Sequence, residues 1–271
     1  MLADGHIHIF ESGYKDSGEN EISLYEDLIK QHTIKSSLVV GYEGENWALG
    51  NNAYISALAL TRPWMHPLAF FKPSNLQVSE LENYLELGFE GITLYIFSDV
   101  EVAELHAVDK SVWAWLLDHK WMVSVNSKDS YWNVWLDVLS KLPELTLLIS
   151  HLGLPKVDSG HLTNDDIAIE LSIIKKLHNF ANVYLKLSGF YALEQAQPAY
   201  PYPSLRNYLL YIINNFNRDR LIWGSDFTPA LATVSFEQTF EHFSTLDFLQ
   251  AGDLEKILYQ NMMQLLTNLG K

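Results

Sequence analysis

The chain has 271 residues, 48% of them hydrophobic, and a formal net charge of −15, which argues against nucleic acid or anionic lipid as a partner because both are bound through clustered Lys and Arg. It contains no cysteine, so disulfides and thiolate ligands are excluded, and a metal site must use His, Asp, Glu or neutral oxygens. No secretion signal or run of about 18 apolar residues is present, and we expect a soluble, cytoplasmic protein that acts on a small molecule.

The first apolar stretch, residues 2–10, reads LADGHIHIF and is predicted to be a β-strand. Alternation along an extended chain places Leu2, Asp4, His6 and His8 on one face, and Gly5, Ile7 and Ile9 on the other. Two imidazoles on one strand face can hold a single metal ion or a single substrate atom. We expect the rest of the chain to bring further polar partners to this pair.

Seven further apolar runs are predicted strands: 37–41, 68–71, 91–97, 121–126, 145–151, 183–189 and 221–226. A helical pattern follows each strand, at 24–29, 47–60, 81–88, 109–119, 132–142, 167–180, 205–216 and finally 236–249 and 254–269. Ser74 and Gln77 have the spacing of a capping box before the third helix.

Eight strands, each followed by a helix, are typical of a (β/α)₈ barrel, and we predict one such domain over residues 1–271. An open doubly wound sheet is the rival fold, but the GxGxxG signature that often follows its first strand is absent. The longest irregular stretches, 153–164 and 191–203, are candidate lids over the C-terminal face of the barrel.

Polar residues gather at the ends of the predicted strands, where barrel enzymes place their catalytic groups. They are His6 and His8, Lys72, Tyr95, Asn126, His151, Lys186, Ser188 and Asp226. Each has a structural explanation of its own: Asp226 can cap a helix, His151 can hold a turn, and Lys186 can reach water. A His or Asp at the same end of the first, sixth and eighth strands nevertheless favours a functional site.

Five motifs, DGHIHIF, ISHLGLP, VYLKLSGFY, LIWGSDFTP and YQNMMQLL, occur in this order along the chain. The set resembles the amidohydrolase superfamily, in the branch of amidohydrolase-related barrels that includes 2-pyrone-4,6-dicarboxylate lactonase and aminocarboxymuconate-semialdehyde decarboxylase. The resemblance implies a distorted (β/α)₈ barrel whose site uses His6, His8, His151 and Asp226.

Asn126 departs from that pattern, because metal-dependent members of the branch usually carry a His at the end of strand five. His6, His8 and Asp226 then remain as ligands, which is enough for a catalytic ion such as zinc or manganese. The lactonase of the branch also lacks this His and works without a metal. One divalent metal and no metal at all therefore both remain open.

The predicted reaction is attack of activated water on a carbonyl carbon, with Asp226 as the base. His6, His8 and His151 would bind the metal or polarise the carbonyl. The substrate is expected to be a lactone, ester or cyclic amide with at most one or two carboxylates, held by Lys72, Tyr95, Asn126, Lys186, Ser188 and Tyr191. A metal-dependent nonoxidative decarboxylase and a noncatalytic binding barrel are the alternatives.

The arginines, Arg62, Arg206, Arg218 and Arg220, are not expected to supply the cations of the site, and Arg218 and Arg220 are expected at the opposite end of the barrel. Apolar residues of the last helices, Phe240, Phe243, Leu258 and Leu265, suit either the barrel wall or a homo-oligomer interface.

Overall fold

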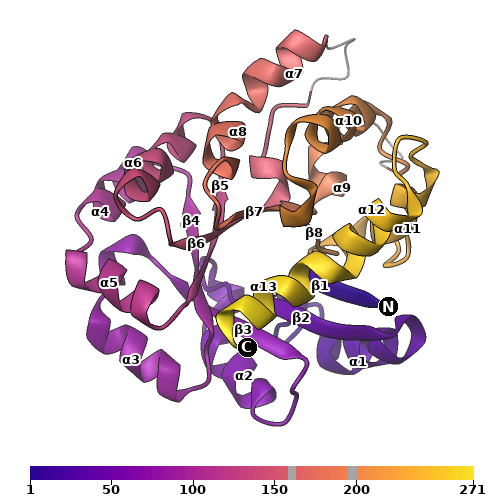
Figure 1. Cartoon of the computed structure of the whole chain (residues 1–271). Helices are drawn as coiled ribbons and strands as arrows, with labels where there is room; N and C mark the ends of the chain where they lie inside the picture. Colours follow the sequence, from indigo (N-terminus) through magenta and orange to yellow (C-terminus); the bar gives the residue numbers. More distant parts are fainter. Residues whose placement is uncertain (158–162, 195–199) are drawn as a thin grey trace.

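The computed structural model describes residues 1–157, 163–194 and 200–271. Eight parallel strands form one sheet in the order β1 to β8, surrounded by helices (Figure 1). The strands are β1 Leu2–Ile7, β2 Ile34–Val40, β3 Met65–Phe71, β4 Gly91–Ile96, β5 Met122–Ser127, β6 Thr146–Ile149, β7 Val183–Leu187 and β8 Leu221–Trp223. A bridge between Ile7 and Phe227, just after β8, brings the two ends of the sheet together. The predicted (β/α)₈ barrel is confirmed.

The helices follow the predicted alternation with the strands. They are α1 Glu21–His32, α2 Asn51–Ala59, α3 Val78–Glu86, α4 Asp99–His106, α5 Lys110–Asp118, α6 Asn133–Lys141, α7 Asn164–Glu170, α8 Ser172–His178, α9 Phe190–Leu193, α10 Arg206–Asn215, α11 Gln238–Glu241, α12 Ala251–Glu255 and α13 Asn261–Leu269. None of the described helices is long and apolar enough to cross a membrane.

Two local predictions about helices are wrong. Ser74 does not cap α3, because residues Pro73–Asn75 form a short 3-10 turn, and α3 begins only after Gln77. Proline fixes φ near the helical value and favours this early turn. Helix α4 has no counterpart among the predicted helices; Ser98 caps it by accepting a hydrogen bond from the N–H of Glu101.

The apolar core has two parts. The larger part lies between the sheet and the surrounding helices and includes Phe243, while Phe240 and Leu258 pack against it. A smaller cluster fills the inside of the barrel, and α13 contributes to it. Its buried members are Ala3, Leu38, Val40, Leu68, Met122, Leu148, Tyr184, Ile222, Met262, Leu265 and Leu266. Apolar residues of the last helices therefore serve the barrel wall in this chain.

The predicted alternation along the first strand is wrong at Asp4. The pairing of β1 with β2 shifts register on both sides of this residue. Ala3 therefore joins the cluster inside the barrel, whereas Asp4 accepts a hydrogen bond from the hydroxyl of Tyr25 on α1, at 3.1 Å. A β-bulge bends a strand and re-aims its side chains. Asp4 consequently does not share a face with His6 and His8.

Candidate active site

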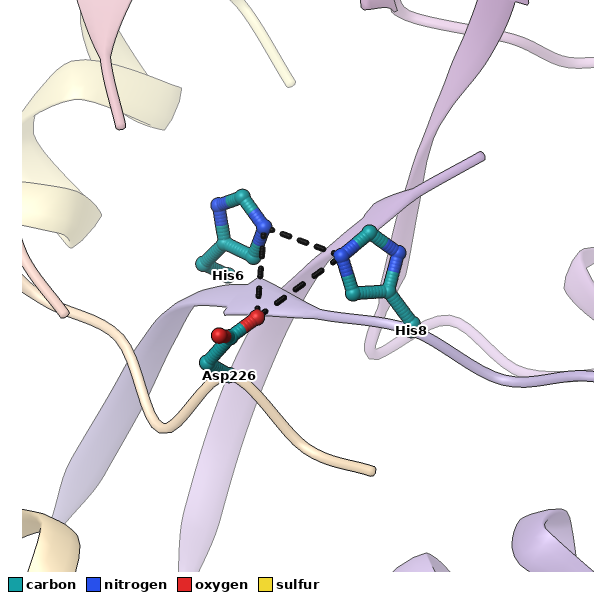
Figure 2. Close-up of side chains that lie close together, drawn as sticks. All are labelled: His6, His8 and Asp226. Carbon is teal, nitrogen blue, oxygen red and sulfur yellow. Dashed lines mark hydrogen bonds and ion pairs between the residues drawn. The ribbon is translucent and has the colours of Figure 1, made fainter. Parts of the chain in front are cut away.

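Three polar side chains converge where β1 and β8 end (Figure 2). The Nε2 atoms of His6 and His8 are 3.2 Å apart, and they lie 3.6 and 3.7 Å from Oδ1 of Asp226. All three residues are buried, and one ligand atom from each lies within 4.8 Å of the others. The group can therefore hold one metal ion or one polar substrate atom.

His8 has a tautomer that its surroundings define. Its Nδ1 lies 2.7 Å from the carbonyl oxygen of Val40 on β2. A carbonyl can only accept, so Nδ1 carries the proton and Nε2 presents a lone pair to Asp226 and His6. Burial lowers the pKa of His8 to about 4, although the Asp226 carboxylate opposes the shift. His8 is thus neutral at pH 7, as a ligand or acceptor should be.

His6 is in contact with a buried lysine. Nζ of Lys186, from β7, lies 3.2 Å from Nδ1 of His6 and donates to Oγ of Ser124 at 2.9 Å. Burial lowers the pKa of Lys186 to about 7, against the favourable charges of Asp226 and Asp4. An ammonium donates to Nδ1 and leaves the imidazole proton on Nε2, whereas a neutral amine can accept from Nδ1–H. A charged Lys186 therefore fixes the proton of His6 on Nε2, whereas a neutral Lys186 permits either tautomer.

His151 approaches the pair from the sixth strand. Its ring centroid lies 4.7 Å from that of His6, and its Nδ1 lies 3.0 Å from Oγ of Ser188. Burial lowers the pKa of His151, so this imidazole is also neutral at pH 7. His151 has φ +53° and Asp226 has φ +58°, in the left-handed region that non-glycine residues rarely adopt. Such strained residues concentrate at functional sites.

Two side chains fix the orientation of Asp226. The hydroxyl of Tyr191 on α9 donates to Oδ2 at 2.8 Å, which leaves Oδ1 directed at the two histidines. Behind the site, Oδ1 of Asp4 accepts the backbone N–H of His6 at 3.2 Å and that of Ser225 at 2.8 Å. Asp4 thus joins the strand that carries the His pair to the turn that carries Asp226.

Two glycines leave space for these imidazoles. A Cβ at Gly189, which has φ +68°, would lie 2.4 Å from Nδ1 of His151. A Cβ at Gly224 would lie 2.7 Å from Cβ of His6. Any larger residue at either position would displace a histidine of the site, so the motifs LSGFY and WGSDF need their glycines for close packing.

The site opens into a cavity of about 590 Å³, and His8, His151 and Asp226 line it. Six aromatic residues also line it: Phe10, Tyr14, Tyr42, Trp47, Tyr95 and Tyr191. This volume lies within the usual range for small-molecule sites, which combine apolar walls with a few polar groups.

The structure brings most of the predicted substrate-binding residues close to this cavity, but not all. Tyr95, Asn126 and Tyr191 line it. Lys186 and Ser188 are buried beneath it, where they contact His6 and His151 instead of its wall. Lys72, in contrast to its prediction, does not line this cavity. It is exposed and lines a separate cavity, because the chain turns away at Pro73 immediately after β3.

Sequence reasoning missed the contribution of the first two loops after strands. Tyr14 and Lys15 follow β1, and Tyr42, Glu45 and Trp47 follow β2; all five line the cavity. The available signal was aromatic side chains within otherwise polar loops, ESGYKDSGEN and GYEGENWALG, at the C-terminal end of strands. Of the two predicted lids, residues 158–162 and 195–199 lie outside the described residues, whereas Leu154 and Tyr191 line the cavity.

The residues present fit a divalent metal. His8 offers a lone pair at Nε2, Asp226 offers Oδ1, and His6 offers Nε2 when Lys186 is neutral. In addition, the amide oxygen of Asn126 is buried without a hydrogen-bond partner, although Asn126 lines the cavity. Such an orphaned acceptor is typical of a site that receives a ligand or an ordered water. Nitrogen and oxygen donors of this kind suit zinc or manganese.

The chain forms a parallel barrel with two His side chains at the end of its first strand and an Asp after its last. A family model described as amidohydrolase matches residues 3–266. The chain therefore belongs to the amidohydrolase family and is an enzyme of that family, as its motifs predicted. No curated protein matches the sequence.

Several solved structures share this fold. An amidohydrolase from Burkholderia multivorans with bound HEPES has a TM-score of 0.81 at 14% identity, covering 98% of this chain and 99% of that chain. An amidohydrolase from the same organism with bound zinc has a TM-score of 0.80 at 15% identity and the same coverage. A probable 2-pyrone-4,6-dicarboxylic acid hydrolase from Acinetobacter baumannii, with citric acid bound, has a TM-score of 0.75 at 20% identity, covering 100% and 99%.

Proposed function

We propose that this protein hydrolyses a lactone, ester or cyclic amide of a small carboxylic acid by attack of water on the carbonyl carbon. The observation that carries the proposal is the orientation of Asp226, whose Oδ2 is held by Tyr191 while Oδ1 faces the His pair at the end of the cavity. A carboxylate held beside neutral imidazoles is suited to accept a proton from water.

In the proposed reaction, Oδ1 of Asp226 accepts a proton from water as the water oxygen bonds to the carbonyl carbon. An imidazole stabilises the negative charge on the carbonyl oxygen only if it directs an N–H group at that atom, a role open to His6 and His151 but not to His8, whose N–H is bound to the carbonyl of Val40. When the tetrahedral intermediate collapses, the bond from carbon to the leaving oxygen or nitrogen breaks. Asp226 returns its proton to that atom, so the base is regenerated and a lactone yields a hydroxy acid.

A divalent ion held by His6, His8 and Asp226 would supply Lewis-acid polarisation of the carbonyl and of water. The residues that orient these side chains are the same in the two cases. Lys186 and Val40 orient the two imidazoles, and Tyr191 orients the carboxylate.

The test uses wild-type protein and Asp226→Asn on a panel of lactones, esters and cyclic amides. Proton release in a pH-stat reports the lactones and esters, and appearance of the free amine reports the cyclic amides, whose hydrolysis near pH 7 releases no net proton. We expect kcat to fall by about 10²–10⁴-fold in the variant because it lacks the proton acceptor. The exposed Asp27, paired with Lys30 on α1, provides the matched control Asp27→Asn, which should keep full activity. Full activity in Asp226→Asn would overturn the assignment.

Two further measurements separate the alternatives. Elemental analysis of protein purified without chelator, repeated on His6→Ala, reports whether a metal is bound by this residue set. Release of carbon dioxide from carboxylated probes, with no ring opening, would instead identify a decarboxylase. Ligand binding that Asp226→Asn leaves unchanged, together with no turnover of any probe by the wild type, would indicate a noncatalytic barrel.

A further inference from the structure

The loop after β1 presents a lysine to the cavity. Among the described residues that line the cavity, Lys15 is the only cation. We propose that Lys15 binds a carboxylate of the substrate and that the site accepts substrates with one negative charge in preference to neutral or doubly charged ones. This inference rests on the proposed hydrolytic function and adds the charge class of its substrate.

Lys15 is not engaged by another charge. It is in none of the ion pairs that the described residues form, and its Nζ lies 5.0 Å from the centroid of the Tyr14 ring. A cation over an aromatic face keeps hydrogen-bond donors available for an anion. The Tyr14 ring also packs edge-on against Trp47, with ring centroids 5.2 Å apart. The ammonium therefore lies against the aromatic residues that line the cavity.

Glu21 fixes the loop that carries Lys15 through hydrogen bonds to its backbone. Glu21, which is buried at the start of α1, accepts the N–H of Phe10 at 2.7 Å and the N–H of Tyr14 at 2.6 Å. Lys15 itself has φ +55°, a left-handed conformation that a residue without glycine's freedom seldom adopts. The buried Glu21 carboxylate thus holds the backbone immediately before Lys15. The position of this lysine is therefore set by the fold, unlike that of a lysine in an unrestrained surface loop.

No other described cation can take this role. Arg62, Arg206 and Arg218 pair with Glu26, Asp247 and Asp253, and Arg220 donates to the backbone carbonyls of Phe180 and Val183. Lys186 is fully buried beneath His6, and Lys72 lines the separate cavity. One available cation matches one substrate carboxylate.

Glu45 sets the upper limit on substrate charge. It lines the same cavity as Lys15, from the loop after β2, and is exposed. A second carboxylate on the substrate would find no described cation there and would meet the negative charge of Glu45. The pair of opposite charges therefore selects a monoanion, in contrast to the dicarboxylate in the name of the Acinetobacter baumannii hydrolase.

The experiment uses γ-butyrolactone, its 5-carboxylate and its 4,5-dicarboxylate, which present no, one and two carboxylates on the same ring. Calorimetric binding and pH-stat kinetics are measured for the wild type, Lys15→Met, Lys15→Arg and the matched control Lys72→Met. We expect Lys15→Met to lower the preference for the monocarboxylate over the neutral lactone at least about tenfold, through KM rather than kcat, because a charged hydrogen bond is lost.

Lys15→Arg should restore most of that preference, and Lys72→Met should keep it. Glu45→Gln should raise relative binding of the dicarboxylate severalfold. An unchanged preference in Lys15→Met, or an equal loss in Lys72→Met, would overturn the inference. If none of the lactones, esters and cyclic amides of the panel is hydrolysed, the proposed function fails, but calorimetry with the three lactones still reports whether binding of the monocarboxylate depends on Lys15.

Discussion

The two ends of the barrel interior are built from the same strands but by different rules. Strand β6 contributes Leu148 to the apolar cluster and leads to His151 in the site; β8 contributes Ile222 and leads to Asp226. At the apolar end, side chains pack without directional requirements. At the other end, His6, His8, His151 and Asp226 each contact a particular partner at a particular atom.

This difference separates stability from chemistry within one barrel. Apolar burial stabilises by about 25 cal/mol per Å² and tolerates volume-conserving exchanges. A buried cation such as Lys186 is costly to desolvate even when it is hydrogen-bonded. Apolar packing at one end therefore offsets the cost of burying polar groups at the other. Substitutions at the apolar end should lower the free energy of unfolding and keep activity, whereas substitutions at the polar end should lower activity and keep the free energy of unfolding.

Leu148→Ala should have the largest effect on stability of the substitutions at either end. Leu148 is fully buried in the inner cluster, and a leucine truncated to alanine in a core loses transfer free energy and leaves a cavity. We expect the free energy of unfolding in urea to fall by about 2–5 kcal/mol. The value of kcat/KM for the folded fraction should stay at the wild-type level; a large loss would mean that the two ends are coupled.

Lys186→Met should show the reverse signature. The variant removes a buried charge but keeps a similar volume, so the free energy of unfolding should stay the same or rise. His6 loses its hydrogen-bond partner, and loss of an orienting neighbour typically costs about 10–100-fold in activity or metal affinity. Urea denaturation, pH-stat kinetics and zinc titration measure these three quantities. A variant that is both unstable and fully active would contradict the contrast between the two ends.

The fold could be predicted because strands buried on both faces read as continuous apolar runs, each with a helical pattern behind it. The residues at strand ends followed from that register, which is why His6, His8, His151 and Asp226 were found together. The register failed at Asp4, because the bulge in β1 depends on pairing with β2 and on Tyr25, which are remote in sequence.

The positions of loop side chains could not be predicted from the register of the strands. Lys15 reaches the cavity because Glu21 accepts hydrogen bonds from the backbone just before it. No local pattern in ESGYKDSGEN predicts these hydrogen bonds. Lys72 follows a strand directly but points elsewhere, since Pro73 starts a turn. Strand ends are fixed by the barrel, whereas loop side chains are placed by individual tertiary hydrogen bonds.

His242 extends the comparison to a polar group buried outside the site. Its ring lies among aromatic side chains, with centroids 4.2 Å from Phe243 and 4.9 Å from Phe190. Burial lowers the pKa of His242 to about 3, opposed by a backbone hydrogen bond with Gln238. An unfolded histidine titrates near 6.5, so between these pH values the unfolded chain binds a proton that the folded chain does not.

This histidine should therefore make the protein less stable as pH falls below about 6.5, by roughly 1.4 kcal/mol per pH unit. His242→Phe removes that contribution, so the loss of unfolding free energy between pH 7 and pH 5 should be about 2 kcal/mol smaller than in the wild type. Urea denaturation at both pH values measures it, with the exposed His106→Phe on α4 as the matched control. Equal slopes for wild type and His242→Phe would show that the histidine accepts its proton in the folded state.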